Sequence, residues 1–356
     1  MSSAHSKISF VEAINQGIDF AMREKNNLVV IGEGVPDPKG IFSTTSGLQE
    51  KYGSERVFDM PLSENGMTGI AIGAAINNTP VLLIHQRIDF SILSMDQIIN
   101  NAAKWHYMFN GEMNVPIVIR MIIGRGWGQG PQHSQNLQAL FAHIPGLKVV
   151  TPASVLDARE MIYAALKDND PVIFIEHRWL YNLEEPVPTD ITLKRLNGAE
   201  IIKEGTDVTL VSNSLGVIEC IKAAKILSRF NINVEIVDLR SIRPIDHATV
   251  SKSIAKTGRL IVVDFSCGSV GVASEVIAKT VSNNFNDLKT KPLAITLPEH
   301  PVPTSHFIAN SYYFNEKDIV RIVSENFGIK IPEAAIEKYT KREFLDVPSS
   351  DYHGPF

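Results

Sequence analysis

Cysteine is scarce in this chain of 356 residues, which contains only Cys220 and Cys267. The two lie far apart and form no CxxC spacing, so the sequence predicts neither a disulfide framework nor a structural zinc site, and we expect two reduced thiols. Apolar stretches approaching about 18 residues are also absent, and the segment MSSAHSKISF has no apolar core of signal-peptide length. We therefore expect no membrane partner and a cytoplasmic location, in the cytosol or a matrix-like compartment.

An excess of positive charge is absent as well. The formal net charge is −5, with both signs interspersed, so no basic stripe for nucleic acid and no polybasic segment for an anionic membrane is present. With 44% hydrophobic and 21% charged residues, the composition is that of a folded globular chain. At this length about two domains are expected, and their partners are small molecules or proteins.

The sequence does contain a regular alternation of helices and apolar strands. Ser9 and Glu12 have the spacing of a capping box, and the apolar residues that follow predict an amphipathic helix over 9–24. Continuous apolar runs then recur, with helix-length segments between them, at 28–32, 80–84, 116–122, 148–151 and 171–176. This pattern is typical of a parallel sheet covered on both faces.

The alternation stops in a polar, proline-containing stretch over 177–206 and then resumes with apolar runs from residue 207. Such a break is typical of a connector between domains. The sequence therefore predicts an α/β fold with two doubly wound, mostly parallel-sheet domains. We place the first at 1–190 and the second at 207–356, with a linker over 191–206.

Ligands of parallel α/β sheets bind beyond the carboxyl ends of the strands, so the polar residues there are candidate site residues. They are Glu33, Glu64 before a glycine- and alanine-rich helix, the segment His85–Phe90, and the loop 124–134 with Gln132 and His133. The loop lacks the spacing of a P-loop or of GxGxxG, and the chain has no GxSxG, which disfavours a nucleotide site and a serine hydrolase. Two alternatives remain open, a plain flexible loop around His133 and a helix-terminal charge at Glu64 that answers the helix dipole.

Taken together, these segments resemble the β subunit of the thiamine-diphosphate-dependent 2-oxoacid dehydrogenases, the decarboxylating component of pyruvate and branched-chain complexes. Ten segments occur in the family order, among them VVIGEGV (29–35), RVFDMPLSENG (56–66), DFSILSMDQIINNAAK (89–104), QHSQ (132–135) and VEIVDLRSIRPID (234–246). The resemblance implies a pyrimidine-binding first domain and a transketolase C-terminal second domain.

The resemblance also implies the roles of single residues. Glu64 matches the carboxylate that bonds the pyrimidine ring of thiamine diphosphate, and Phe90 matches the aromatic residue that stacks on that ring. Glu33 matches the acidic residue of the first-strand motif, close to the cofactor or an interface. His133 matches the active-site histidine, which handles a proton of the intermediate or assists acyl transfer.

Cofactors and partners follow from the same resemblance. It implies an α subunit in an α2β2 heterotetramer, which holds the diphosphate and Mg²⁺ through a GDG motif that this chain lacks. A lipoyl acyltransferase core or another acceptor takes the acyl fragment. Some family members bind K⁺ through backbone oxygens, and the alternative is a simple turn before a strand. The matching positions are Ile117, Ala165, Leu166, Asp168 and Asp170.

One segment departs from the family pattern. The usual form is Glu-Phe-Gln-Phe-Ala-Asp-Phe, whereas this chain has His85 and Arg87 in the sequence Ile-His-Gln-Arg-Ile-Asp-Phe. We expect His85, Arg87 and Gln132 to face a substrate or acceptor that is more polar or anionic than pyruvate, with Arg125 and Trp127 continuing that surface. The alternative for Arg87 is an ion pair with the α subunit.

The sequence leaves three functions open. A dehydrogenase β subunit is the main interpretation. A split transketolase-like or acyloin-forming transferase without a lipoyl partner is the second. A noncatalytic assembly or regulatory subunit is the third, and the presence of both Glu64 and His133 argues against it, because a scaffold needs neither.

Overall fold

The computed structural model describes residues 5–39, 41–124, 128–338 and 344–348. The chain divides into two compact units, the first built from segments 1–124 and 140–196 and the second from 125–139 and 197–351. Each unit has helices around a mostly parallel sheet, so the predicted fold class is confirmed. Within the described ranges, no helix has the length and apolar content needed to cross a membrane.

The sheet of the first unit has the strand order β6-β7-β5-β4-β2-β3, and neighbouring strands are parallel. The central strands β4 and β5 are buried along their whole length, which is why their sequences are continuous apolar runs. The strands are β2 (Val29–Gly32), β3 (Val57–Asp59), β4 (Val81–His85), β5 (Ile117–Ile123), β6 (Lys148–Val150) and β7 (Val172–His177).

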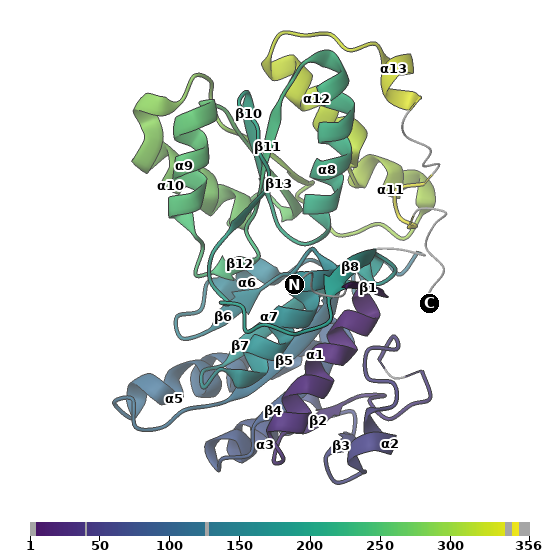
Figure 1. Cartoon of the computed structure of the whole chain (residues 1–356), viewed down its shortest axis with the longest axis vertical. Helices are drawn as coiled ribbons and strands as arrows, with labels where there is room; N and C mark the ends of the chain where they lie inside the picture. Colours follow the sequence, from purple (N-terminus) through teal and green to yellow (C-terminus); the bar gives the residue numbers. More distant parts are fainter. Residues whose placement is uncertain (1–4, 40, 125–127, 339–343, 349–356) are drawn as a thin grey trace. The chain divides into compact units, whose positions relative to one another are not determined.

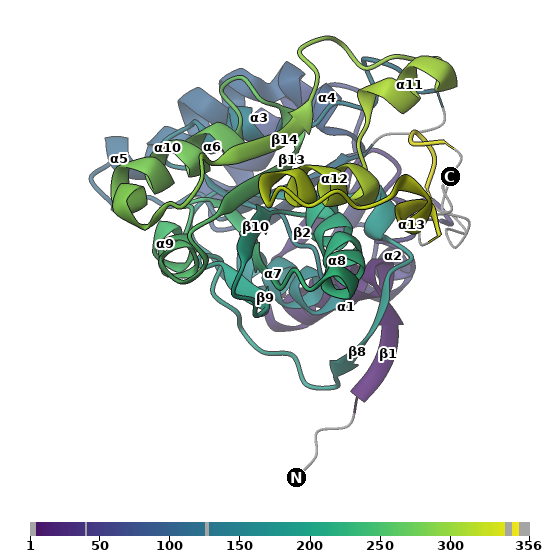
Figure 2. The same ribbon diagram turned by 90° about the horizontal axis from the view of Figure 1, so that it is seen from above.

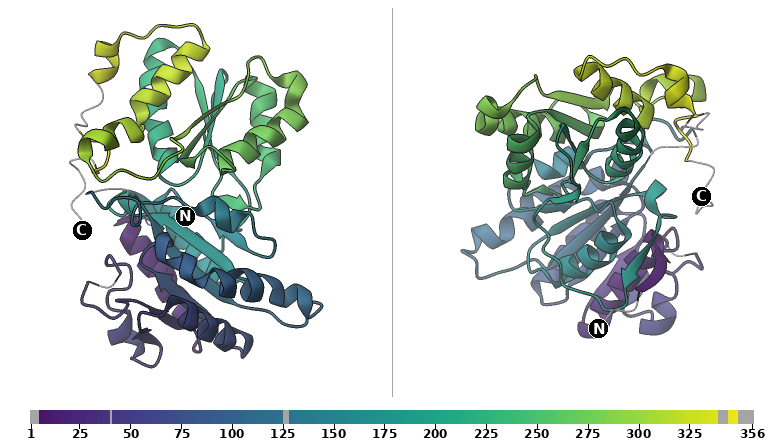
Figure 3. Two further views of the ribbon diagram at one scale, coloured as in Figure 1. Left: turned by 180° about the vertical axis from the view of Figure 1, so that it is seen from behind. Right: turned by 45° about the horizontal axis from the view of Figure 1, so that its top comes forward.

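Helices cover both faces of this sheet. The predicted helix over 9–24 is α1 (Phe10–Glu24), which begins with the expected capping box of Ser9 and Glu12. It packs on α7 (Val155–Lys167), and a Cβ at Gly17 would lie 2.4 Å from the Arg159 carbonyl oxygen, so glycine permits this close contact. Figure 1 shows α1 and α7 on one face, and the left view of Figure 3 shows the helices of residues 64–108 on the other.

The helices of that second face are α3 (Glu64–Ile76), α4 (Ile88–Ser91), the 3-10 helix η1 (Ile92–Ser94), the π-helical segment η2 (Gln97–Ala102) and α5 (Ala103–Met108). A two-stranded antiparallel ribbon of β1 (His5–Ser9) and β8 (Glu184–Pro188) was not predicted. The remaining short elements are α2 (Leu48–Tyr52), α6 (Gln138–Ala142) and η3 (Arg178–Leu180).

The sheet of the second unit has the order β14-β13-β10-β11-β9, in which only the edge strand β9 is antiparallel. Its strands are β9 (Glu200–Lys203), β10 (Val208–Ser212), β11 (Val234–Asp238), β13 (Leu260–Cys267) and β14 (Leu293–Leu297). Figures 1 and 2 show α8 (Leu215–Leu227) beside α12 (Glu316–Asn326), and α9 (His247–Thr257) beside α10 (Val272–Asn284). The shorter elements are β12 (Ser241–Arg243), η4 (Ser228–Phe230), η5 (Phe285–Asp287), α11 (His306–Tyr312) and α13 (Glu333–Glu337).

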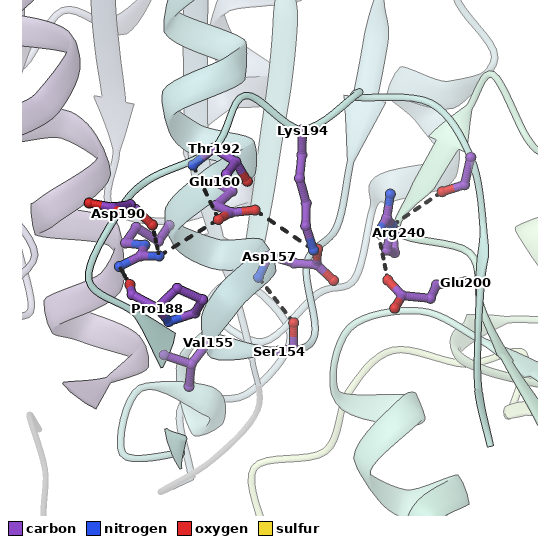
Figure 4. Close-up of polar contacts among 12 residues, drawn as sticks. Ser154, Val155, Asp157, Glu160, Pro188, Asp190, Thr192, Lys194, Glu200 and Arg240 are labelled. Atoms are coloured by element: carbon purple, nitrogen blue, oxygen red, sulfur yellow. Dashed lines mark hydrogen bonds and ion pairs between the residues drawn. The ribbon is translucent and has the colours of Figure 1, made fainter. Parts of the chain in front are cut away.

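The predicted linker over 191–206 is fixed by polar contacts and contains the strand β9. Near its start, Lys194 Nζ lies 2.7 Å from Asp157 Oδ1 of α7. Further along, the guanidinium of Arg240 donates to Glu200 Oε2 at 2.7 Å. Figure 4 shows both contacts. Prolines and acidic residues before the linker, over 184–188, predict an irregular connector across 177–206, but backbone pairing with β11 makes a strand of Glu200–Lys203.

Candidate active site

Three acidic side chains lie near the carboxyl ends of β2 and β3. Asp59 ends β3 and accepts a hydrogen bond from Gly34 N at 2.7 Å, Glu33 follows β2, and Glu64 begins α3. Burial raises the pKa of the Glu33 carboxyl, and the negative charges of Glu64 and Asp59 raise it further. The structure therefore brings Glu33 and Glu64 close enough for their charges to interact.

Glu64 is buried, and Glu33 is half-buried with one carboxyl oxygen shielded from water. Glu64 is 8% exposed, and Glu33 Oε1 is buried with no hydrogen-bond partner in the described parts of the chain. A buried acceptor without a donor is costly, so a ligand that brings an N–H or amino group would stabilise this site. The aminopyrimidine of thiamine diphosphate offers such donors, so these residues fit the cofactor that the resemblance implies.

Local packing holds this part of the sheet in place. A Cβ at Gly32 would lie 2.6 Å from the Ile84 carbonyl oxygen, so β2 and β4 approach closely just before Glu33. The side chain of Gln86 then donates to the Glu33 carbonyl oxygen at 2.9 Å. On the other side, the buried Thr68 hydroxyl of α3 donates to Ser94 Oγ at 3.0 Å. These bonds fix the loop after β4 beside the acidic residues.

The departure from the family pattern lies on β4 and in the loop that follows it. His85 is 2% exposed, burial lowers its pKa to about 4, and its Nε2 has no hydrogen-bond partner among the described residues. It is therefore a neutral imidazole at pH 7. Phe90 is half-buried on α4, and its backbone N donates to the Arg87 carbonyl oxygen at 3.3 Å.

Arg87 shares its surroundings with a second arginine. It is 6% exposed, and burial together with the positive charge of Arg178 lowers its pKa to about 10, although Asp89 and Tyr181 oppose this. Arg178 follows β7 directly, and its guanidinium lies 5.4 Å from the centre of the Phe42 ring. The structure thus places two buried arginines near each other, with Asp89 and Tyr181 close enough to offset part of their repulsion.

Sequence reasoning missed Arg178 as a site residue. The signal that could have found it is its position immediately after a strand of the parallel sheet, the same rule that selected His85 and Arg87.

Gln132 and His133 belong to the second unit, because the segment 125–139 does. Gln132 is exposed, and His133 is half-buried with its backbone N 3.4 Å from the Gly130 carbonyl oxygen. Gly130 has φ +66°, and a Cβ there would lie 2.5 Å from Thr304 Oγ1. Both the backbone conformation and the close contact therefore favour glycine at this position of the loop. Glu33, Glu64, His85, Arg87 and Phe90 all belong to the first unit. Arg125 and Trp127 lie outside the described residues.

The five positions predicted for K⁺ lie at the ends of two elements of the first unit. Ile117 begins β5, and the other four lie at the end of α7 or in the turn before β7. The Leu166 carbonyl oxygen accepts a hydrogen bond from Lys25 Nζ at 2.8 Å. In the ranges that the structure describes, no three histidine, cysteine, aspartate or glutamate side chains are grouped as metal ligands, and both cysteines are free thiols.

Two family models match the chain. One is the transketolase pyrimidine binding domain, over residues 6–184, and the other is the transketolase C-terminal domain, over 197–319. Among solved structures, a split-gene transketolase described as an inactive β4 tetramer aligns with a TM-score of 0.73 at 21% identity. That alignment covers 91% of this chain and 99% of the other and supports the fold.

Curated relatives are similar over most of the chain. The pyruvate dehydrogenase E1 component subunit beta-1 of Oryza sativa subsp. japonica is 37% identical, covering 94% of this chain and 90% of the relative. The acetoin:2,6-dichlorophenolindophenol oxidoreductase subunit beta of Cupriavidus necator is 39% identical, covering 86% and 93%. The protein of the same description from Bacillus subtilis is 36% identical, covering 90% and 97%.

Proposed function

This chain belongs to the family of transketolase-like β subunits that includes the pyruvate dehydrogenase E1 β subunits, and from that membership we propose that it is the β subunit of a heteromeric, thiamine-diphosphate-dependent enzyme that decarboxylates a 2-oxoacid. We place the pyrimidine-binding domain at 1–190 and the C-terminal domain at 207–356, while the two family models match 6–184 and 197–319. The nearly buried Glu64, whose charge acts on Glu33, and the buried Glu33 oxygen, which has no hydrogen-bond partner among the residues that the structure describes, are the observation that carries the proposal.

The cofactor, when bound, supplies a thiazolium carbon that becomes a nucleophile after losing a proton. In our proposal Glu64 hydrogen-bonds the pyrimidine ring and holds or releases a proton at its carboxyl oxygen. The low exposure of Glu64 supports this role, because a buried carboxyl group forms stronger hydrogen bonds with a ligand than one that competes with water. Phe90 stacks on the ring, and Glu33 accepts a hydrogen bond beside it.

We assign His85, Arg87 and Gln132 to the substrate. The buried arginine pair supports an anionic group on the donor or the acceptor, such as a carboxylate or phosphate. Neutral His85 can donate or accept one hydrogen bond without adding charge. His133 moves a proton of the reaction or assists transfer of the acyl fragment to a lipoyl arm or another acceptor.

An α subunit is the partner that completes this enzyme, in an α2β2 heterotetramer in which the α subunit supplies most of the diphosphate and Mg²⁺ contacts. Exposed apolar side chains of the first unit support an obligate protein partner. They are Ile70 on α3, Leu93 on η1, and Tyr107 and Met108 on α5. The free thiols Cys220 and Cys267 support a reducing compartment such as the cytoplasm.

A transferase without a lipoyl partner is the second candidate function. Relatives at 36–39% identity are described as acetoin oxidoreductase β subunits, so small hydroxyketones belong in any substrate panel.

The proposal is tested by coexpressing the chain with an α-type subunit and assaying decarboxylation of a panel of 2-oxoacids, together with cleavage of acetoin. We expect turnover of at least one substrate by the complex, and neither turnover nor tight cofactor binding by the chain alone. Calorimetry could instead show tight Mg²⁺-dependent binding of thiamine diphosphate to the single chain. Together with turnover by that chain, this result would contradict the proposal that an α subunit is needed to complete the site. A complex that turns over nothing in the panel would contradict the function.

A further inference from the structure

Two lysines from other elements contact the end of α7 and the turn before β7, where the resemblance implies a potassium ion. The first is Lys25, the residue directly after α1, whose Nζ donates to the Leu166 carbonyl oxygen at 2.8 Å. Leu166 is 2% exposed. Its carbonyl oxygen, one of the predicted potassium ligands, is therefore already bonded to a cation of this chain.

Lys25 is partly removed from water to make this contact. Burial lowers the pKa of its ammonium group and the charge of Lys167 lowers it further, while Asp168 and Glu24 oppose these effects. The influence of Asp168 shows that the ammonium lies close to the turn. An ammonium group has three donors and one full charge, so it can serve carbonyl oxygens as a monovalent cation does.

The second lysine neutralises the acidic side chains of the same turn. Lys148 Nζ lies 2.8 Å from Asp168 Oδ1 and 2.9 Å from Asp170 Oδ2. Burial lowers the pKa of Lys148, but its hydrogen bonds and ion pairs with Asp168 and Asp170 outweigh this and raise it overall. The Asp168 backbone N, in turn, donates to the Ala165 carbonyl oxygen at 3.1 Å.

The residues at this turn therefore do not fit a bound potassium ion. A hard cation binds through several oxygen ligands. Here the Leu166 carbonyl oxygen already binds an ammonium, and the Ala165 carbonyl oxygen accepts an N–H. Lys148 also neutralises the Asp168 and Asp170 side chains, so their charge is already balanced without a further cation. A further cation would also be repelled by the two lysines. We propose that the Lys25 ammonium takes the place of the potassium ion, so that this chain folds and stays stable without potassium.

The proposal is tested on the full-length chain by thermal unfolding in potassium, sodium and choline chloride at matched ionic strength. We expect the Tm of the native chain in potassium to agree with the other two within about 1 °C, because no specific site remains to be filled. Lys25→Met keeps the apolar stem but removes the ammonium, and it should lower the Tm by about 3–10 °C. The control Lys225→Met, at an exposed lysine on α8, should leave the Tm within about 1 °C of native.

Three results would overturn the proposal. One is a potassium-specific rise in the Tm of the native chain. Another is a thallium peak on the Leu166 carbonyl oxygen in crystals of the native chain grown with Tl⁺, a heavy substitute for K⁺. The third is a native Tm for Lys25→Met. Should that variant fail to fold, the salt comparison and the thallium experiment on the native chain still decide, and neither depends on the reaction that the enzyme catalyses.

Discussion

The negative charge of Glu64 has two opposite effects on the stability of the fold. Glu64 begins α3, where a negative charge answers the helix dipole, yet it is nearly buried, where a negative charge is costly. A purely structural helix-terminal acid would gain more from lying in water. The combination favours a functional role for this carboxyl group.

Glu64→Gln should therefore separate activity from stability. The amide keeps the size of the side chain and one acceptor oxygen but cannot exchange a proton, so we expect the α–β complex to lose about 10²-fold or more in kcat. The Tm should stay near the native value, and the exposed control Glu55→Gln should change neither quantity. The measurement is 2-oxoacid decarboxylation by the coexpressed complex. A native kcat for Glu64→Gln would show that this carboxyl is only a helix-terminal charge.

Arg87→Phe should change which 2-oxoacids the enzyme prefers. Loss of a charge-assisted hydrogen bond should lower kcat/KM for the preferred anionic substrate by about 10–100-fold and improve the relative rate with apolar 2-oxoacids. Steady-state kinetics over the panel give the ranking, and gel filtration checks that the α–β complex still forms. An unchanged ranking together with loss of the complex would instead place Arg87 in the α–β interface.

Sequence reasoning selected the candidate site residues, and their roles stay predictions. It reached Glu33, His85 and Arg87 because a general rule puts ligands after parallel strands. It could not find the contact of Lys25 with Leu166, since the two residues lie 141 positions apart and the bond goes to a backbone oxygen. Backbone acceptors carry no signature in side-chain identity.

At the scale of elements, the apolar runs predicted the long strands and helices well. The runs at 116–122 and 171–176 became β5 and β7 with a shift of one residue, because burial on both faces demands continuous apolar sequence. The short strands β1 and β8 were not predicted, because each is stabilised by pairing with the other and neither has a strand-like pattern of apolar residues. One of the helix-length segments that the sequence places between the apolar runs 80–84 and 116–122 is interrupted by the π-helical segment η2, which no residue type predicts.

Helices α8 and α12 bring two carboxyl groups together in the second unit. Glu219 is fully buried on α8, and its Oε2 accepts a hydrogen bond from the Glu316 backbone N at 3.3 Å. Lys222 Nζ lies 3.1 Å from the other oxygen of Glu219. Burial first, and then the hydrogen bond and charge of Glu219, raise the pKa of Glu316 to about 7. The folded chain thus holds a proton here that the unfolded chain releases near the ordinary glutamate pKa.

This pair predicts a pH dependence of stability with a definite sign. A raised folded pKa stabilises the fold fully below the unfolded value of 4.5, and that contribution is lost as the pH rises through about 7. Glu316→Gln mimics the protonated form, so its urea midpoint should fall less than the native midpoint between pH 5 and 8. The control Glu325→Gln, an exposed residue of the same helix, should follow the native curve. Parallel curves for native chain and Glu316→Gln would contradict the shared proton.

At the scale of the whole molecule, a subunit of a heteromeric enzyme is expected to expose apolar side chains at the surface that binds its partner subunit. Leu93 is 63% exposed on η1, close in sequence to Phe90 and Arg87 of the candidate site. An exposed leucine of this kind contributes little to the fold of the single chain but can contribute to association.

Leu93→Glu should accordingly weaken assembly while leaving the isolated chain folded. A charge placed at an apolar interface is desolvated without a partner, so we expect the α–β dissociation constant to rise by about tenfold or more. Copurification with the α subunit and gel filtration report this, and the Tm of the isolated variant should stay native. Leu193→Glu, at a similarly exposed leucine of the connector, is the matched control. Equal complex formation by both variants would place the interface elsewhere.

The second unit takes residues 125–139 from the middle of the sequence that otherwise builds the first. Within that segment, Gln138 donates to the buried Asp264 at 3.2 Å, and Asn136 donates to the Phe265 carbonyl oxygen. These partners are made 126 and 129 residues later, so at ordinary rates of translation the segment leaves the ribosome about 6–25 s before the groups that will hold it. The segment 125–139 thus cannot reach its final form until residues 264 and 265 have been made. A message truncated near codon 200 would therefore yield a product that has most of its first unit but lacks the partners of Asn136 and Gln138.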